Sequence, residues 1–255
     1  MSWNPFNKLI APRKSISKPS EDNEFEERLQ DIVQMEQTLK RMHKDTKKFM
    51  DSSSSLAKLE QKMVTDLYNS SKLIKDADEL ESHAEKLKNI CNETENSQQQ
   101  RDVITRSTFV KPLKGLNEKF ACIHSAVKRK DQSQQDYVKY LAKRDKLAKD
   151  PSTSQSGKYE ANEKYLERTK TDFERRTKQL HEDLPRFYSE AVNYFDPCFK
   201  AFLQGELNHN EKGKLLYDEL AKDFKVPNDM TVEEFNSQVD KMLEEIKTIS
   251  IVKAT

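Results

Sequence analysis

One apolar seam with helical spacing constrains this chain more than any other feature. From Phe25 onward, apolar residues recur at alternating intervals of three and four, so that Phe25, Ile32 and Leu39 lie seven residues apart. This spacing places them on one side of an α-helix. A second seam begins near Leu73 and extends, after a polar segment, to Leu141. A third seam repeats every seven residues, at Tyr159, Leu166, Phe173, Leu180, Phe187 and Tyr194. The sequence therefore predicts an all-α protein of three long helices.

Turn-forming residues separate these seams. The first helix is expected to end at Asn69-Ser70-Ser71, and the segment DPSTSQSG at residues 150–157 is the clearest turn. Proline inside a helix removes a backbone hydrogen bond and bends the axis. We therefore expect bends, not helix ends, at Pro112, Pro185 and Pro197. After Val226-Pro227-Asn228, a short acidic amphipathic helix from Thr231 to about Lys247 is expected to pack on the outside of the bundle.

Composition favours an elongated bundle over a compact globular domain. The chain of 255 residues is 34% apolar and 35% charged and has only 4 glycines, whereas an ordinary globular domain is roughly 45–50% apolar and about 25% charged. A helix of about 70 residues is roughly 100 Å long, and a single bundle that long and thin buries little, so we expect a homodimer. The expected organisation is a basic leader at residues 1–20, a helical domain at 21–228, and a short helix with a tail at 229–255.

The leader leaves two alternatives open. Residues 1–20 contain three prolines and four cations without an acidic residue, which predicts a mostly flexible segment. Its large apolar residues either enter a membrane interface or pack against the adjacent domain, and we favour the second; they are Trp3, Phe6, Leu9 and Ile10. Asn4-Pro5-Phe6 also matches a tripeptide that some endocytic adaptor domains bind, although a match of three residues is common by chance.

Positive charge is gathered in one stretch of the second helix. Between residues 127 and 149 lie eight Lys or Arg and three Asp, although the whole chain has a formal net charge of only +1. At about 100° per residue from Val127, the expected buried side contains Phe120, Ile123, Gln134, Val138 and Leu141. A stripe of cations lies about 100–160° from Val127, with Arg129 just beyond it and Asp136 at its edge; it contains Lys128, Lys139, Lys143 and Lys146. A solvated helix face normally mixes both signs in i to i+4 pairs, and this stripe does not.

The third helix repeats this arrangement just after the turn. Four of its cations share a side roughly opposite Phe173, namely Lys164, Arg168, Arg175 and Lys178. Because the turn at 150–157 folds the third helix back on the second, both groups of cations are expected near the same tip. A further, more central group on the first helix contains Lys40, Lys44, Lys47 and Lys48.

Anionic lipid is the expected partner of this charge. A cation held near an anionic membrane gains about 1 kcal/mol, an effect confined to about a Debye length. Nucleic acid would use the same electrostatics. However, the sequence contains no recognition-helix module, and its aromatic residues lie on the apolar seams. We therefore favour a peripheral membrane protein and expect no nucleic-acid partner.

Two segments resemble a known family. AVKRKDQSQQDYVKY, at residues 126–140, is similar to the second-helix motif of amphiphysin-type BAR domains, and LHEDLPRFYSEAVNYFDPCF, at residues 180–199, is similar to their third-helix signature. The resemblance spans the whole chain. It implies a crescent-shaped antiparallel homodimer with a six-helix core, which binds curved membrane through a cationic concave face. It also implies that Pro112 and Pro185 are bends that help to set the curvature.

The resemblance extends to residues and to cellular role. It implies membrane contacts at Lys128, Arg129, Lys139, Lys143 and Lys146. It also implies a cytoplasmic location, with association to membrane and cytoskeleton, and a link to actin organisation, endocytosis, trafficking or cytokinesis. The leader, interrupted by proline, is unlike the amphipathic entry helix of the family's N-BAR members. This difference favours sensing or scaffolding of curvature over membrane insertion.

A second function class stays open, and a third is not expected. The chain would also fit a coiled-coil adaptor whose basic stripes meet acidic surfaces of protein partners, such as GTPases or their regulators. An enzyme is not expected, because the sequence has no Gly-rich phosphate loop and no GxSxG motif. Its five His and three Cys are scattered, so we expect neither a metal nor a cofactor, and the cysteine usage indicates a reducing cytosol. No stretch approaches the roughly 20 apolar residues that span a bilayer.

Overall fold

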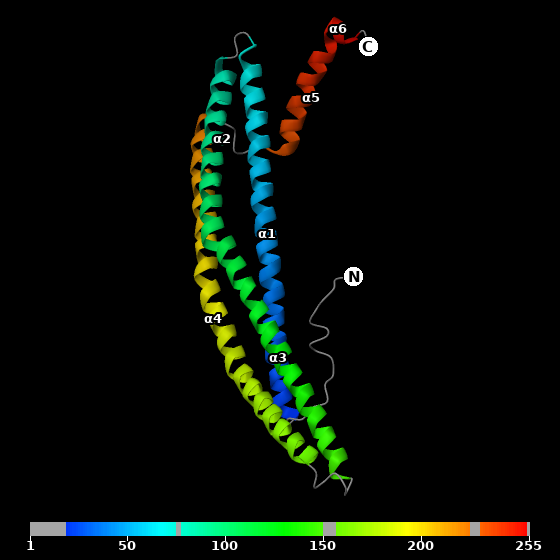
Figure 1. Cartoon of the computed structure of the whole chain (residues 1–255). Coiled ribbons are helices and arrows are strands. Elements are labelled where there is room, and N and C mark those ends of the chain that lie inside the picture. The colour runs from blue at the N-terminus through cyan, green and yellow to red at the C-terminus, as the bar shows by residue number, and fades with distance from the viewer. Residues whose placement is uncertain (1–18, 75–77, 150–156, 225–229, 254–255) are drawn as a thin grey trace. The chain divides into compact units, whose positions relative to one another are not determined.

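The computed structural model describes residues 19–74, 78–149, 157–224 and 230–253, and helices account for all the regular structure in these ranges. Figure 1 shows their order along the chain. The elements are α1 (Pro19–Ser71), α2 (Asp78–Thr105), the π-helix η2 (Arg106–Val110), α3 (Lys111–Ala148), α4 (Gly157–Phe224), α5 (Val232–Thr248) and α6 (Ser250–Lys253). The all-α prediction is confirmed, as is the end of the first helix at Ser71. Residues 1–18 of the expected leader and most of the turn at 150–157 lie outside the described residues, and α1 already begins at Pro19.

The chain forms two compact units. Unit 1 contains Met1–Leu59 and Glu95–His209, and unit 2 contains Glu60–Thr94 and Asn210–Thr255. The helix that the sequence predicts as the second is built from three consecutive elements, because α2, η2 and α3 follow one another without a turn.

Unit 1 has a continuous apolar core shared by α1, η2, α3 and α4. Its buried members are Phe25, Leu29, Ile32, Leu39, Phe109, Leu113, Leu116, Phe120, Val127, Leu180, Leu184 and Ala191. Phe109 stacks on Phe202 with ring centroids 4.9 Å apart, and Phe120 meets Phe187 edge-on at 5.2 Å. These residues are the ones that the apolar seams place on one side of each helix. Each large aromatic side chain buried in this way contributes roughly 1.5–3 kcal/mol, so the seams hold unit 1 together.

Unit 2 has a thinner core. Its buried apolar residues among those described are Val64, Ala84, Cys91 and Leu220. Polar pairs join its helices: Gln61 donates to Asn92 at 2.6 Å in a partly buried contact, and Lys86 pairs with Asp223 at 2.8 Å at the surface. Several large apolar residues of this unit remain exposed.

The bend expected at Pro112 is made by the π-helix just before it. The backbone N–H of Lys111 bonds to the carbonyl of Arg106, five residues back, and Pro112 has no N–H with which to continue an α-helical ladder. The hydroxyls of Ser107 and Thr108 donate to the carbonyl of Ile104 at 2.9 and 2.8 Å. A π-turn of this kind absorbs one extra residue and kinks the axis, and Figure 1 shows the ribbon changing direction here. As expected, α4 does not end at Pro185 or Pro197, and both prolines lie inside the helix.

The buried side of α3 was predicted incorrectly at its far end. Val138 is 37% exposed, whereas Lys130 is only 7% exposed and Ser133 is buried. Lys130 of α3 contacts the first turns of α1, because its ammonium lies 4.9 Å from the centroid of the Phe25 ring. Beyond that point α3 packs on α4, as the stacking of Tyr137 on Phe173 at 6.1 Å illustrates. The buried side therefore rotates away from Val127 and toward α4.

Helix α5 is the most exposed element. Thr231 caps it: its hydroxyl accepts from the backbone N–H of Glu234, whose carboxylate accepts in turn from the N–H of Thr231. This capping box fixes where the helix begins. None of the residues of α5 is buried, so the expected packing on the outside of the bundle is not observed.

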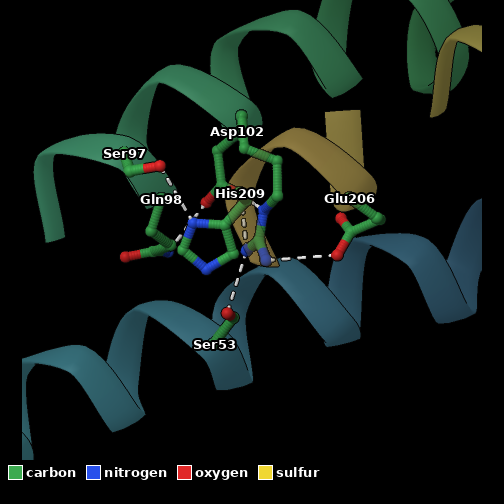
Figure 2. A network of polar contacts seen from close by, with 7 residues as sticks. Ser53, Ser97, Gln98, Asp102, Glu206 and His209 are labelled. Atoms are coloured by element: carbon green, nitrogen blue, oxygen red, sulfur yellow. Dashed lines mark hydrogen bonds and ion pairs between the residues drawn. The ribbon is translucent and has the colours of Figure 1, made fainter. Parts of the chain in front are cut away.

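A buried polar cluster interrupts the apolar core of unit 1 (Figure 2). Arg101 of α2 is 4% exposed, and its guanidinium donates to Ser53 of α1 at 2.9 Å, to Asp102 at 3.0 Å and to Glu206 of α4 at 3.3 Å. His209 lies 3.1 Å from the hydroxyl of Ser97. Burial raises the pKa of Glu206 and lowers the pKa of His209. The guanidinium of Arg101 thus links α1, α2 and α4 at one position along the bundle.

We expect Arg101→Met to lower the free energy of unfolding by about 3–5 kcal/mol, because it leaves two carboxylates without their buried partner. Urea unfolding at a fixed protein concentration measures this. Arg28→Met is the matched control, because Arg28 pairs with Glu24 at an exposed site, and it should change stability little. Equal effects of the two variants would contradict the structural role of Arg101.

His209 predicts a pH dependence of stability. Its pKa lies below the ordinary value near 6.5 because burial, and then the nearby Arg101, oppose its charging. As pH falls through about 6.5, the unfolded chain binds a proton that the folded chain does not, so the free energy of unfolding decreases. We expect His209→Gln to show a smaller decrease between about pH 7 and pH 5.5 in urea unfolding. His43, whose pKa burial also lowers, retains part of the slope. An unchanged slope in the variant would contradict this account.

Candidate membrane-binding surface

The cations predicted on α3 lie on its surface. Lys128, Arg129, Lys139, Lys143 and Lys146 are all exposed. Four of them form what we call the α3 stripe: Lys128, Lys139, Lys143 and Lys146. Among the described residues, no carboxylate lies within 4.0 Å of the ammonium groups of this stripe, whereas neighbouring Arg144 pairs with Asp145 at 2.8 Å. The charge of the stripe therefore remains available to an external anion.

Lys130 lies in the same basic stretch as the α3 stripe, but it is buried and not exposed. Its ammonium lies over the rings of Phe25 and Phe173, 4.9 and 5.8 Å from their centroids. Cation–π contacts of this kind stabilise a buried ammonium. Lys130 therefore belongs to the core of unit 1, while the α3 stripe faces solvent.

The cations predicted on α4 are exposed as well, but several have acidic neighbours. Arg175 pairs with Asp172 at 2.7 Å, and Lys178 lies 3.9 Å from Glu182. Arg176 also reaches Asp172, at 2.8 Å. Hydrogen bonds from Arg176 and Arg175 hold the pKa of Asp172 below its usual range, so this carboxylate stays charged near neutral pH. Lys164 and Arg168 have no carboxylate within 4.0 Å among the described residues.

An open groove between α3 and α4 brings part of this set together. Lys164, Arg168 and Arg175 line it on the α4 side, and Ser133, Asp136 and Tyr140 line it on the α3 side. Lys178 and the α3 stripe do not belong to its lining. Asp136 lines this groove and also lies at the edge of the α3 stripe by its helical phase, so it borders both. We call this feature the α3–α4 groove.

Residue patterns missed several members of the groove. Arg176 was not expected there, since its phase lies near the buried Phe173. Tyr140 and Tyr165 also line the groove, and their rings stack with centroids 5.5 Å apart. In the sequence, Tyr140 precedes the turn at 150–157 and Tyr165 follows it at a similar distance. This placement is the sequence feature that could have indicated their contact.

Other site types are not observed. In the part of the chain that the structure describes, no group of His, Cys, Asp and Glu is placed to hold a metal ion. No helix within the described ranges has the length and apolar character needed to cross a bilayer. Cys91, Cys122 and Cys198 are free thiols.

Comparison with known proteins gives the family. A model of the BAR domain matches residues 16–225, so the chain belongs to the BAR domain family. It is similar to Bridging integrator 3 of Mus musculus, with 28% identity over 254 residues that cover 99% of each chain. It is also similar to the Regulator of cytoskeleton and endocytosis RVS161 of Candida albicans, with 23% identity over 265 residues and 98% of each chain covered.

A solved structure supports the fold. A BAR protein from Galdieria sulphuraria superposes with a TM-score of 0.64 at 12% identity, covering 82% of this chain and 100% of that one. These findings confirm the family that the segments at 126–140 and 180–199 resemble.

Proposed function

We propose that this chain is a non-enzymatic scaffold that binds anionic membranes as a homodimer and senses or stabilises their curvature. The observation that carries the proposal is the α3 stripe, a row of exposed lysines without acidic partners among the described residues. The exposed cations of α4, namely Lys164, Arg168, Arg175 and Lys178, extend this surface, and Arg129 borders it.

Electrostatics alone supplies enough attraction for reversible binding. Each Lys or Arg near an anionic leaflet contributes about 1 kcal/mol. Half of the nine proposed contacts would therefore give about 4.5 kcal/mol, which is an affinity on the order of 1 mM, and two protomers on one surface bind more tightly than one. Because the attraction decays within a Debye length of about 10 Å at 0.1 M salt, the cations must lie close to the headgroups.

Exposed apolar residues of unit 2 support the homodimer. Leu73 is 85% exposed and Met63 is 64% exposed. The same unit also exposes Leu67, Ile74, Leu80 and Leu215, while its own core is thin. Large exposed apolar patches on a folded unit mark interaction surfaces, and a second copy is the partner that the family supplies.

The family also supports a cellular role. The Candida albicans relative is named as a regulator of cytoskeleton and endocytosis. We propose that this chain likewise couples a membrane surface to actin organisation, trafficking or cytokinesis, as a cytoplasmic peripheral protein that is in part cytoskeleton-associated. The coupling would run through actin regulators or proteins of small GTPase pathways.

A coiled-coil adaptor is the second candidate, and α5 favours it. Its exposed apolar residues follow the 3–4 spacing of a helix seam, at Val232, Phe235, Val239, Met242 and Ile246, and Ile249 directly after the helix continues this spacing. Such a seam is suited to a helical protein partner. Vesicle binding without preference for anionic lipid would favour this candidate over the membrane scaffold.

Charge reversal in the α3 stripe should weaken membrane binding. We expect Lys139→Glu/Lys143→Glu to lower affinity for phosphatidylserine vesicles by at least about 30-fold in co-sedimentation, because two contacts of about 1 kcal/mol are lost. Lys241→Glu/Lys247→Glu on α5 makes the same change in net charge and should bind almost normally. Equal losses in both variants would refute the assigned surface.

The apolar surface of unit 2 predicts a second result. We expect Met63→Glu/Leu67→Glu to shift the protein from dimer to monomer in sedimentation equilibrium, since each protomer would place charges in the interface. Helix content should be retained, because both side chains are exposed within the protomer. Ile251→Glu on α6, also at an exposed position, is the control and should remain dimeric. A dimeric double variant would contradict the proposed interface.

A further inference from the structure

An apolar groove lies between α1 and α4 within unit 1, and we call it the α1–α4 groove. Met35 and Met42 form its α1 side, and Tyr188 and Val192, which are 42% and 44% exposed, form its α4 side. Its volume is about 360 Å³, within the range of roughly 300–1,000 Å³ that ligand pockets span. An exposed apolar hollow of this size on a helical unit marks an interaction surface.

The side of α1 that leads to this groove is acidic. At about 100° per residue, Glu24, Glu27 and Asp31 lie on the same side of α1 as the residues that line the groove, and all three are exposed. Arg28 is the only Lys or Arg at residues 23–34, and it already pairs with Glu24 at 2.7 Å. Glu27 and Asp31 have no cation within 4.0 Å among the described residues. Their charges are therefore available to cations from another segment.

The basic leader carries the complementary groups. Four of its large apolar residues fall within eight positions, namely Trp3, Phe6, Leu9 and Ile10. Residues 1–18 also contain four cations and no acidic residue; the cations are Lys8, Arg13, Lys14 and Lys18. An apolar groove that is reached along an acidic helix side matches this segment in hydrophobicity and in the sign of its charge.

The length of the leader fits this path. α1 begins at Pro19, and Met35 of the groove lies sixteen residues farther along the helix, which is roughly 25 Å at 1.5 Å per residue. The segment from Ile10 to Pro19 spans up to about 30 Å when it is extended. The first apolar residues of the leader therefore reach the groove, while the cations between them and α1 pass Glu27 and Asp31.

A second copy of the chain is the competing occupant of the groove. Met35 and Met42 belong to a row on α1 that repeats every seven residues and continues through Phe49 and Leu56 to Met63, which lies in the surface proposed for the homodimer. However, the two groove methionines are half-buried within the protomer, whereas Leu56 and Met63 are more than half exposed. The tethered leader also meets the groove at an effective concentration on the order of millimolar, which favours the leader over a second copy.

We propose that the leader folds back along α1 and packs its apolar side chains into the α1–α4 groove of the same protomer, with its cations beside Glu27 and Asp31. This inference does not rest on the proposed membrane function. Its consequence is that the apolar residues of the leader are held by the protein and not by a membrane interface, so the exposed cations of α3 and α4 bind lipid without an inserted segment.

Trp3 is the only tryptophan of the chain, so its fluorescence reports directly on the leader. In the unmodified protein without vesicles, we expect blue-shifted emission and protection from acrylamide, a neutral quencher. Both should persist in Met63→Glu/Leu67→Glu, because the contact lies within one protomer. Emission and quenching equal to those of the protein unfolded in urea would overturn the proposal.

A charge placed in the groove should release the leader. We expect Val192→Asp to lower the equilibrium constant for docking by at least about tenfold, because an unpaired carboxylate is costly to bury, and acrylamide quenching of Trp3 should rise accordingly. Val103→Asp on α2 is the matched control, since Val103 is 68% exposed and does not line the groove. Circular dichroism checks that both variants keep their helices. Equal quenching in the two variants would overturn the assignment to the groove.

The acidic side of α1 is tested separately. Glu27→Lys/Asp31→Lys should also expose the tryptophan, and the effect should shrink at high salt because screening weakens the repulsion. Asp183→Lys/Glu190→Lys makes the same change in net charge at exposed positions, which lie on the far side of α4 from the groove by helical phase, and should leave the tryptophan protected. Equal effects of the two double variants would overturn the proposed path along α1.

Two further outcomes would assign the leader or the groove elsewhere. If Trp3 is exposed in buffer and becomes shielded only when phosphatidylserine vesicles are added, the leader belongs to the membrane interface and the proposal is wrong. If Val192→Asp dissociates the homodimer while Trp3 stays protected, a second copy occupies the groove and the proposal is again wrong. Neither outcome affects the membrane scaffold, which charge reversal in the α3 stripe tests independently.

Discussion

The burial of Phe109, Phe120 and Val127 among α1, η2, α3 and α4 is the interaction on which unit 1 depends. These residues lie at 0–1% exposure, and they meet partners from α1 and α4 on the same seam. A helix that buries one narrow side must expose the others to water. The position of the α3 stripe follows from this requirement, because Lys128, Lys139, Lys143 and Lys146 lie well away from Val127. The core therefore determines which lysines of α3 face solvent.

Two local features modify the seam without breaking it. Where apolar residues become sparse before the π-helix, Arg101 replaces hydrophobic contact with hydrogen bonds to three helices (Figure 2). A buried cluster of this kind is costly unless each member is paired, so it ties α1, α2 and α4 to one register. Directly after it, η2 bends the chain where Pro112 cannot donate a hydrogen bond. The contacts of Arg101, which fix the helix register, and the bend at η2 lie within a few residues of each other. Both help to position α3.

Much of this was accessible from the amino-acid sequence because helical periodicity is a strong local signal. The three seams, the end of α1, the all-α class and the family could all be inferred from spacing and from two segments. The bend was expected near Pro112 but the π-helix was not, because helical spacing does not show that the N–H of Lys111 bonds five residues back. The error at Val138 arose because a helical phase does not show where a neighbouring helix begins. At Tyr137, which stacks on Phe173, α3 packs on α4, and its buried side is turned toward that helix.

The α3–α4 groove and the polar cluster were not accessible in the same way. Arg101 lies in a segment that looked only polar, and nothing local indicates that Ser53 and Glu206 meet it. Likewise, Tyr140 and Tyr165 stack because of the way α3 and α4 pair, and the sequence leaves that pairing open. Contacts between residues that are distant in the sequence can be identified only from the folded structure. The side of its own helix on which a residue lies can be predicted from the sequence alone.

Binding of the unmodified protein to vesicles, measured against both lipid charge and salt, tests the central claim most directly. Binding should rise steeply with the fraction of phosphatidylserine. It should also weaken strongly as salt rises from about 0.1 M to about 1 M, because the Debye length contracts from about 10 Å to about 3 Å. Binding of equal strength to neutral phosphatidylcholine vesicles, unchanged by salt, would contradict a membrane surface built from the exposed cations of α3 and α4.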